Sequence, residues 1–333
     1  MRAMVLHRPA PIETNPLVLE DLEQPVPADD ELLVRVRTCG VCRTDLHVTE
    51  GDLPPKHPSM VPGHEVVGVV EQMGALCARF KLGDRVGIAW LRETDGTCKF
   101  CSRERENLCP NARFTGWDHN GGYAEFATVR EACAYALPDA IGDEAASPLL
   151  CAGIIGFRAI KRAGVVPGMT VGLYGFGGSA HLALQVLKHW KCTVYVMSRA
   201  GIHRDLANEL GADWIGEASD TPPQPLDAAI MFAPAGELVP PALRALDRGG
   251  ILAIAGIYLT DIPALDYERE LFYERELRSV TANTRADGEE FLRIAGEIPI
   301  KSFTVPMALD EANRALSMLK HDELRGAAVL HVS

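Results

Sequence analysis

The sequence lacks the features of a membrane-spanning, secreted or nucleic-acid-binding chain. It contains no apolar stretch of about 18 residues, which a transmembrane helix needs, and its start, MRAMVLHRPAPIETNP, lacks the apolar core of a signal peptide. It also has no basic run. Its 33 Lys and Arg residues are outnumbered by 45 Asp and Glu residues, which gives a net charge of −12. We therefore expect a cytoplasmic protein that binds neither membrane nor nucleic acid.

The 333 residues are enough for two domains, and 47% hydrophobic content is ordinary for a globular protein. Up to about residue 150 the pattern is strand-rich. For example, Leu32, Val34 and Val36 alternate with Arg35 and Arg37. After about residue 152, short apolar runs alternate with helical segments, which is typical of a buried parallel sheet. We expect an α/β protein with one strand-rich part and one doubly wound part.

A glycine-rich turn lies where the first strand of the doubly wound part should lead into a helix. In this segment, GFGGSA, a strand precedes the first glycine and a helix follows, which is the context that makes such a motif meaningful. Gly175 allows a tight turn, and Gly177 lets the backbone approach a pyrophosphate at the helix N-terminus. Ala180 takes the third, small position. We expect a dinucleotide site that includes Gly175, Gly177, Gly178, Ser179 and Ala180.

The end of the next strand reports on the choice between NAD and NADP. NAD-binding proteins usually have Asp or Glu there, but this chain has Ser198 followed by Arg199. Without a carboxylate, a 2′-phosphate is not repelled, and the guanidinium can pair with it. These residues favour NADP; the alternative is that Arg199 is only a solvated surface charge.

Nine cysteines in a reducing compartment suggest metal ligands or core thiols rather than disulfides. Cys42, His64 and the distant Cys151 could supply two thiolates and one imidazole, and three protein ligands leave the fourth position of a zinc ion open for catalysis. A second group, Cys98-x2-Cys101-x7-Cys109, has the spacing of a structural zinc site but offers only three thiols.

Taken together, the segments GVCRTDLH, GHEVVGVVEQMG, LGDRV, CKFC, LLCAG and GFGGSAHLAL resemble the zinc-dependent alcohol dehydrogenases of the medium-chain dehydrogenase/reductase family. The resemblance covers nearly the whole chain, in the family's order and distances. It implies a GroES-like catalytic domain of residues 1–152 and 287–333, and a Rossmann-type NAD(P) domain of residues 153–286. It also implies a small alcohol or aldehyde substrate and assembly as a homodimer or homotetramer.

The resemblance assigns roles to residues around the expected catalytic zinc. Thr44 would accept the alcohol proton, which passes through the cofactor ribose to His47 and then to solvent. Asp45 would hold the zinc-binding imidazole by its second nitrogen. Glu65 would lie behind the metal and exchange with water as a ligand, and Arg43 would pair with the pyrophosphate.

Two further expectations come from the same alignment. Trp90 falls in the substrate pocket, where a large aromatic ring favours slender substrates, although it could equally fill the core between strands. In the structural zinc lobe the family has a cysteine three residues before Cys98, and here that position is Asp95. Asp is a competent zinc ligand, so we expect a second zinc on Asp95, Cys98, Cys101 and Cys109; the alternative is a metal-free loop.

Two other classes of function stay open at this point. A zinc-free enone or quinone reductase of the same superfamily would not need Cys42, His64 and Cys151. A non-enzymatic nucleotide-sensing zinc protein would not need the relay of Thr44 and His47. The physiological alcohol does not follow from the sequence.

Overall fold

The structure is a computed structural model that describes residues 1–199 and 201–332. The chain forms two compact units: Met1–Ala152 together with Ala282–Ser333, and Gly153–Thr281. The sequence analysis placed the second boundary between residues 286 and 287, whereas the second unit ends at Thr281. The amide of Asn283 lies 3.5 Å from the hydroxyl of Tyr135, and the Arg285 amide donates to Glu106 at 2.8 Å. These contacts attach residues 282–286 to the first unit.

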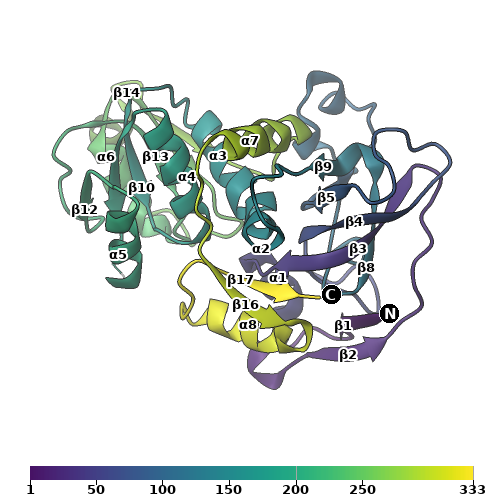
Figure 1. Cartoon of the computed structure of the whole chain (residues 1–333). Helices are drawn as coiled ribbons and strands as arrows, with labels where there is room; N and C mark the ends of the chain where they lie inside the picture. The colour runs from purple at the N-terminus through teal and green to yellow at the C-terminus, as the bar shows by residue number, and fades with distance from the viewer. Residues whose placement is uncertain (200, 333) are drawn as a thin grey trace. The chain divides into compact units, whose positions relative to one another are not determined.

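The first unit is built on a seven-stranded sheet in the order β16-β17-β3-β4-β5-β9, in which β8 also pairs with β3 (Figure 1). All pairs in it are antiparallel except β16 with β17. Two-stranded sheets, β1-β2 and β6-β7, complete the unit. Its strands are β1 (Arg2–Leu6), β2 (Leu17–Asp21), β3 (Glu31–Gly40), β4 (Glu65–Met73), β5 (Arg85–Ile88), β6 (Leu91–Glu93), β7 (Arg113–Phe114), β8 (Phe126–Arg130), β9 (Ala134–Ala136), β16 (Thr304–Ala308) and β17 (Ala327–His331).

The expected alternation along β3 is present, with Leu32, Val34 and Val36 buried and Arg35 and Arg37 exposed. Helices and 3-10 turns make up the rest of this unit. The α-helices of this unit are α1 (Arg43–Glu50), α2 (Asp143–Ala146), α7 (Arg285–Glu297) and α8 (Ala312–Lys320). Its 3-10 turns are η1 (Ile12–Thr14), η2 (Cys101–Arg103), η3 (Glu106–Leu108), η4 (Glu131–Cys133), η5 (Ser147–Leu150) and η8 (Leu309–Glu311).

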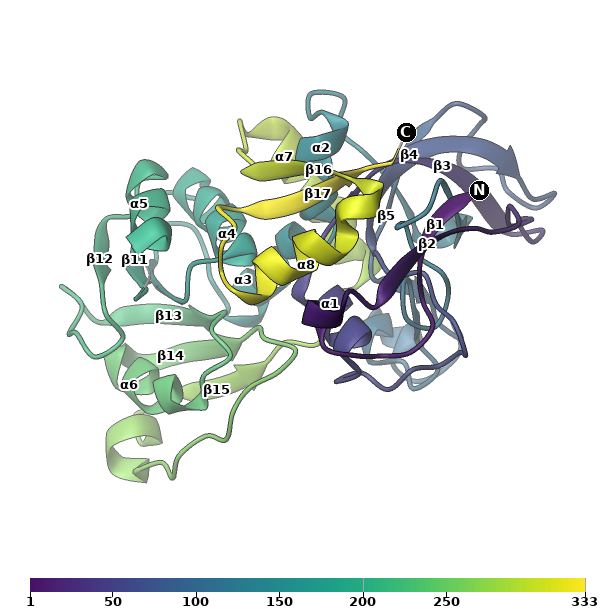
Figure 2. The same cartoon turned by 90° about the horizontal axis from the view of Figure 1, so that it is seen from below.

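The second unit contains a six-stranded sheet in the order β12-β11-β10-β13-β14-β15, in which every pair is parallel (Figure 2). The strand order reverses between β10 and β13, and ligands of such sheets bind at that reversal point. Its strands are β10 (Thr170–Tyr174), β11 (Thr193–Met197), β12 (Trp214–Gly216), β13 (Leu226–Met231), β14 (Leu246–Ile254) and β15 (Glu276–Ser279). Its helices are α3 (Ala152–Arg162), α4 (Gly178–His189), α5 (Gly201–Glu209), α6 (Val239–Ala245), the 3-10 turn η6 (Gly236–Leu238) and the π-helical turn η7 (Tyr267–Leu271).

Burial in this unit explains the apolar runs of the sequence. The last four residues of both β10 and β11 are buried, on both faces of the strands, as expected when helices cover a parallel sheet on two sides. Among the residues that the structure describes, no helix combines the length and the apolar composition needed to cross a lipid bilayer.

Candidate active site and metal centres

Four potential metal ligands from distant parts of the chain converge in the first unit. Cys42 ends the turn after β3 and is the N-cap of α1, His64 and Glu65 stand at the start of β4, and Cys151 follows η5. One ligand atom from each of these residues lies within 4.8 Å of the others. The sulfur atoms of Cys42 and Cys151 are 3.8 Å apart. We call Cys42, His64, Glu65 and Cys151 the cysteine–histidine centre.

The polar atoms of this centre are suited to a metal. The Nε2 atom of His64 and the Oε2 atom of Glu65 are buried and have no hydrogen-bond partner among the described residues. Burying such atoms without a partner is costly, and a metal ion would satisfy them. A hydrogen bond from the Cys151 thiol, together with the nearby His64, lowers the pKa of Cys42 well below its usual range despite burial. Burial and the neighbouring Cys42 raise the pKa of Glu65.

Asp45 connects the centre to the helix that carries Cys42. Its Oδ1 atom lies 2.8 Å from Nδ1 of His64 and accepts the Gly63 amide at 3.2 Å. Its Oδ2 atom accepts the Cys42 amide at 2.9 Å, which caps α1, and the Tyr123 hydroxyl at 3.2 Å. The carboxylate therefore orients the imidazole and fixes the loop that carries the thiolate at the same time.

Tyr123 is a member of this network that the sequence analysis missed. Its side chain is completely buried, and burial raises its pKa well above the usual range, so the hydroxyl stays protonated as a donor. Gly63 has a φ of +98°, and a Cβ atom there would lie 2.4 Å from the Tyr123 ring. Gly63 is thus required both by its backbone conformation and by the close approach of Tyr123.

The residues expected to move protons stand on α1. Thr44 is buried in the first helical turn, next to the Cys42 cap. His47 lies one turn later, and its Nδ1 atom is 2.7 Å from a carboxylate oxygen of Asp52, a partner that the sequence analysis did not identify. Arg43 is exposed, and its guanidinium donates to the Leu319 carbonyl and to Asp322, both at 3.1 Å.

Trp90 lies against the cysteine–histidine centre. Its ring meets the His64 ring edge-on, with centroids 4.9 Å apart, and stacks on Phe114 at 4.8 Å. Trp117 continues the stack, and the Lys56 ammonium lies 4.6 Å from the centroid of its ring. The structure thus places the Trp90 ring against His64 of the cysteine–histidine centre.

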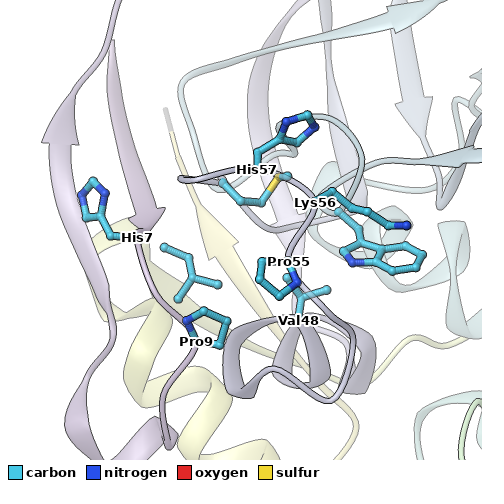
Figure 3. A pocket seen from close by; sticks show the side chains of 9 residues that line it. His7, Pro9, Val48, Pro55, Lys56 and His57 are labelled. Atoms are coloured by element: carbon cyan, nitrogen blue, oxygen red, sulfur yellow. The ribbon is translucent and has the colours of Figure 1, made fainter.

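Figure 3 shows a pocket between the first strand, α1 and the loop of residues 55–60, with the side chains of Lys56 and His57 at its border. Its free space is about 10 Å³, room for roughly one water molecule. None of the residues that the sequence analysis assigned to the active site lines this pocket.

The second metal group lies in the loop between β6 and β7. Asp95, Cys98, Cys101 and Cys109 each place a ligand atom within 4.8 Å of the others, and the sulfur atoms of Cys98 and Cys101 are 3.6 Å apart. Hydrogen bonds from the Cys98 amide and from Asn111 hold the pKa of Asp95 well below its usual value, so the carboxylate is ionised. We call these four residues the lobe site.

The glycine-rich turn has the backbone expected for a dinucleotide site. Gly175 follows β10 with a φ of +84°, and a Cβ atom there would lie 2.8 Å from the Ala233 nitrogen. Gly177 is the N-cap of α4, and a Cβ atom there would meet nothing within 4 Å, so the space in front of the helix is open. Gly178, Ser179 and the buried Ala180 form the first turn of α4.

Ser198 and Arg199 directly follow β11, the strand beside β10. Ser198 is buried, and its amide donates to the Gly216 carbonyl at 3.0 Å, whereas Arg199 is exposed. Neither residue brings a carboxylate to the end of β11.

Comparison with known proteins decides the family. Residues 28–139 match the model of the alcohol dehydrogenase GroES-like domain. The chain is 55% identical to a probable alcohol dehydrogenase AdhA of Mycobacterium tuberculosis, over 99% of this chain and 97% of the relative. It is 33% identical to an alcohol dehydrogenase of Geobacillus stearothermophilus, over 96% and 97% of the two chains. The chain belongs to the zinc-dependent alcohol dehydrogenases of the medium-chain dehydrogenase/reductase family.

Solved structures of alcohol dehydrogenases have the same fold. A cinnamyl alcohol dehydrogenase of Sorghum bicolor superimposes with a TM-score of 0.90 at 27% identity, covering 99% of this chain and 97% of that one. A cobalt- and zinc-bound alcohol dehydrogenase of Pyrobaculum aerophilum gives a TM-score of 0.89 at 27% identity, covering 100% and 99%. The expected family, the GroES-like plus Rossmann-type fold class and the reaction class are confirmed: the chain is an NAD(P)-dependent alcohol dehydrogenase.

Proposed function

We propose that Cys42, His64 and Cys151 hold the catalytic zinc of this alcohol dehydrogenase, which interconverts small alcohols with aldehydes or ketones and uses NADP in preference to NAD. The buried, unpartnered Nε2 atom of His64 beside two thiol groups is the observation that carries this proposal. Three such ligands match a catalytic zinc site with one position left for substrate. A zinc ion there would act as a Lewis acid toward the substrate oxygen.

The surrounding residues prepare the centre for this ion. Asp45 accepts the Nδ1–H of His64, and this tautomer leaves the Nε2 lone pair free for the metal. Glu65 offers an additional buried oxygen next to the ligands and would serve as an exchangeable ligand. Trp90 limits the space beside His64 and favours slender substrates.

The proton of the alcohol would leave along α1. The Thr44 hydroxyl would take this proton from the substrate oxygen while giving up its own. The released proton would reach His47, one helical turn later, by way of the cofactor ribose that the family resemblance places between them, and His47 would release it to solvent. Asp52 holds the His47 ring by Nδ1 and leaves Nε2 as the atom that takes up the proton. The position of Thr44 beside the Cys42 cap and the contact of His47 with Asp52 support this assignment.

The nucleotide would bind the turn of Gly175 and Gly177, with its pyrophosphate at the N-terminus of α4, where amide groups and the helix dipole favour an anion. The open space in front of Gly177 supports this position. Arg199 would pair with the 2′-phosphate of NADP. Arg43 would bind the pyrophosphate after releasing its ion pair with Asp322. The Asp322 side chain is largely exposed, so this ion pair lies at the surface.

We further assign a second, structural zinc to Asp95, Cys98, Cys101 and Cys109. Three thiolates and an ionised carboxylate make a complete tetrahedral donor set. Assembly as a homodimer or homotetramer is supported by the second unit. There β15 is an edge strand, and apolar side chains are exposed in the adjoining segment: Ile257, Tyr258, Ile262, Tyr267, Phe272 and Tyr273.

Turnover assays test the function. Ethanol, benzyl alcohol and the corresponding aldehydes should be turned over with NADP(H), and more slowly with NAD(H). Activity should vanish after chelation and return with zinc. Full activity after complete metal removal would reject the zinc proposal. Activity restricted to enones or quinones would instead favour the reductase chemistry that needs no metal.

A further inference from the structure

The carboxylate that replaces a cysteine in the lobe site has a precise set of hydrogen-bond donors. The Oδ1 atom of Asp95 accepts the backbone amides of Thr97 and Cys98, both at 2.9 Å. The Oδ2 atom accepts the side-chain amide of Asn111, also at 2.9 Å. Asn111 stands two residues after Cys109, the last thiol of the site, and it lies on the surface.

An ionised carboxylate offers about four lone-pair positions, two on each oxygen. The two backbone amides occupy both positions on Oδ1, and Asn111 occupies one on Oδ2. The Cys109 thiol also hydrogen-bonds this carboxylate. Cys109 is itself one of the four ligands, so it would lose its proton on binding the metal, and the position that it uses on Asp95 would then be open to the metal. The donors thus restrict Asp95 to binding a metal through one oxygen, which suits a tetrahedral site.

A carboxylate needs this restriction more than a thiolate does. The sulfur of a cysteine is a single donor atom, whereas a carboxylate can rotate, bind through both oxygens or turn to solvent. The backbone amides fix only Oδ1, and the Cys109 thiol would lose its proton to become a metal ligand, so Asn111 is the amide that would still hold Oδ2 in orientation when the metal is bound. We propose that Asn111 is a positioning residue for the lobe metal and that Asp95 and Asn111 together replace the missing thiolate. This inference rests on the proposed structural zinc.

The test measures zinc release from the lobe site, not activity. Purified zinc-loaded protein is mixed with a chromogenic chelator. The slow phase of zinc release that remains after the catalytic zinc has been removed is followed, because it reports the zinc of the lobe site. Asn111→Ala should accelerate this phase about tenfold, since groups that orient metal ligands typically contribute ten- to a hundredfold to metal affinity. Asn111→Asp, which has the same shape but no donor, should accelerate it at least as much. Asn208→Ala, at an exposed asparagine of α5, is the control and should change nothing.

Repeating the Asn111 substitution in a protein that already carries Asp95→Cys separates a positioning role of Asn111 from a general effect on the loop. In Asp95→Cys the fourth ligand is a thiolate that needs no amide partner, so adding Asn111→Ala should leave zinc release unchanged, a non-additive result expected only for coupled residues. The same acceleration in both backgrounds would overturn the inference, as would wild-type release from Asn111→Ala.

The outcome for Asp95→Ala distinguishes the two proposals. If Asp95→Ala loses the lobe zinc while Asn111→Ala retains it normally, the structural zinc stands and the role of Asn111 is wrong. If the unaltered lobe carries no zinc and Asp95→Ala changes nothing, the structural zinc and this inference are both wrong.

Discussion

The Nδ1 atom of His64 lies 2.8 Å from Oδ1 of Asp45, and both side chains are buried. The contact fixes which nitrogen of the imidazole faces the two thiols, and the same carboxylate caps the helix that begins after Cys42. The ligand set and the helix of the proton relay thus depend on one carboxylate. Each of the following predictions tests a part of this arrangement.

Asp45→Asn should weaken zinc retention at the cysteine–histidine centre. The substitution keeps the shape but removes the charge that orients His64, and such outer groups typically contribute about 10- to 100-fold to metal affinity. Chelator competition on folded protein measures the effect. Asp143→Asn, at a carboxylate that binds Arg37 and Arg85 in the same unit, is the control and should retain zinc normally. Equal zinc retention by Asp45→Asn and Asp143→Asn would contradict the role of Asp45.

Tyr123→Phe should lower both stability and zinc affinity. It removes one of the hydrogen-bond donors to Asp45, and losing a buried hydrogen bond costs about 1–2 kcal/mol. Denaturant unfolding and chelator competition report the two effects. Tyr135→Phe, which removes another buried hydroxyl of the same unit, should leave zinc affinity unchanged. The prediction fails if the two variants affect zinc affinity alike.

Much of the site could be predicted from the sequence, because ligand spacing and glycine turns are local patterns. The spacing and the family resemblance pointed to Cys42, His64 and Cys151, which the structure brings together. The partners Tyr123, Asp52 and Asn111 were missed because a hydrogen bond between side chains depends on how the chain folds, and no motif marks them.

Among the elements of the fold that the sequence analysis did not identify are α7 and β16. A recognisable signal did exist for α7, because Thr284 and Asp287 form a capping box at its start. The thirteen-residue helix carries several polar residues on its exposed side, which weakened its apolar pattern. For β16 the pattern is short and half-exposed, and only its pairing with β17 defines it as a strand.

Thr44→Ala should nearly abolish turnover, because it removes the hydroxyl that takes the alcohol proton. Thr44→Ser, which keeps the hydroxyl, should retain most of it. His47→Gln should reduce the rate mainly below neutral pH, where solvent replaces a missing base least well. The measurement is the pH profile of kcat and kcat/KM for alcohol oxidation. Wild-type rates for Thr44→Ala at every pH would exclude this proton route.

Arg199→Asp should reverse the preference between the two nucleotides. The charged pair with a 2′-phosphate should give NADP an advantage of about ten- to a hundredfold in kcat/KM, and an aspartate should accept the ribose hydroxyls of NAD instead. Steady-state kinetics with both nucleotides provide the readout. Better use of NAD than of NADP by the unaltered protein would reject the assignment of Arg199.

The zinc content of Cys151→Ser, measured by native mass spectrometry together with turnover, tests the central claim most directly. The unaltered chain should carry two zinc ions, and Cys151→Ser should carry only the lobe's ion and have lost turnover, since a hydroxyl is a poor substitute for a thiolate ligand. Cys77→Ser, at a cysteine outside both metal groups, should match the unaltered chain in both measurements. If Cys151→Ser keeps two zinc ions or wild-type turnover, the catalytic metal does not bind where we have placed it.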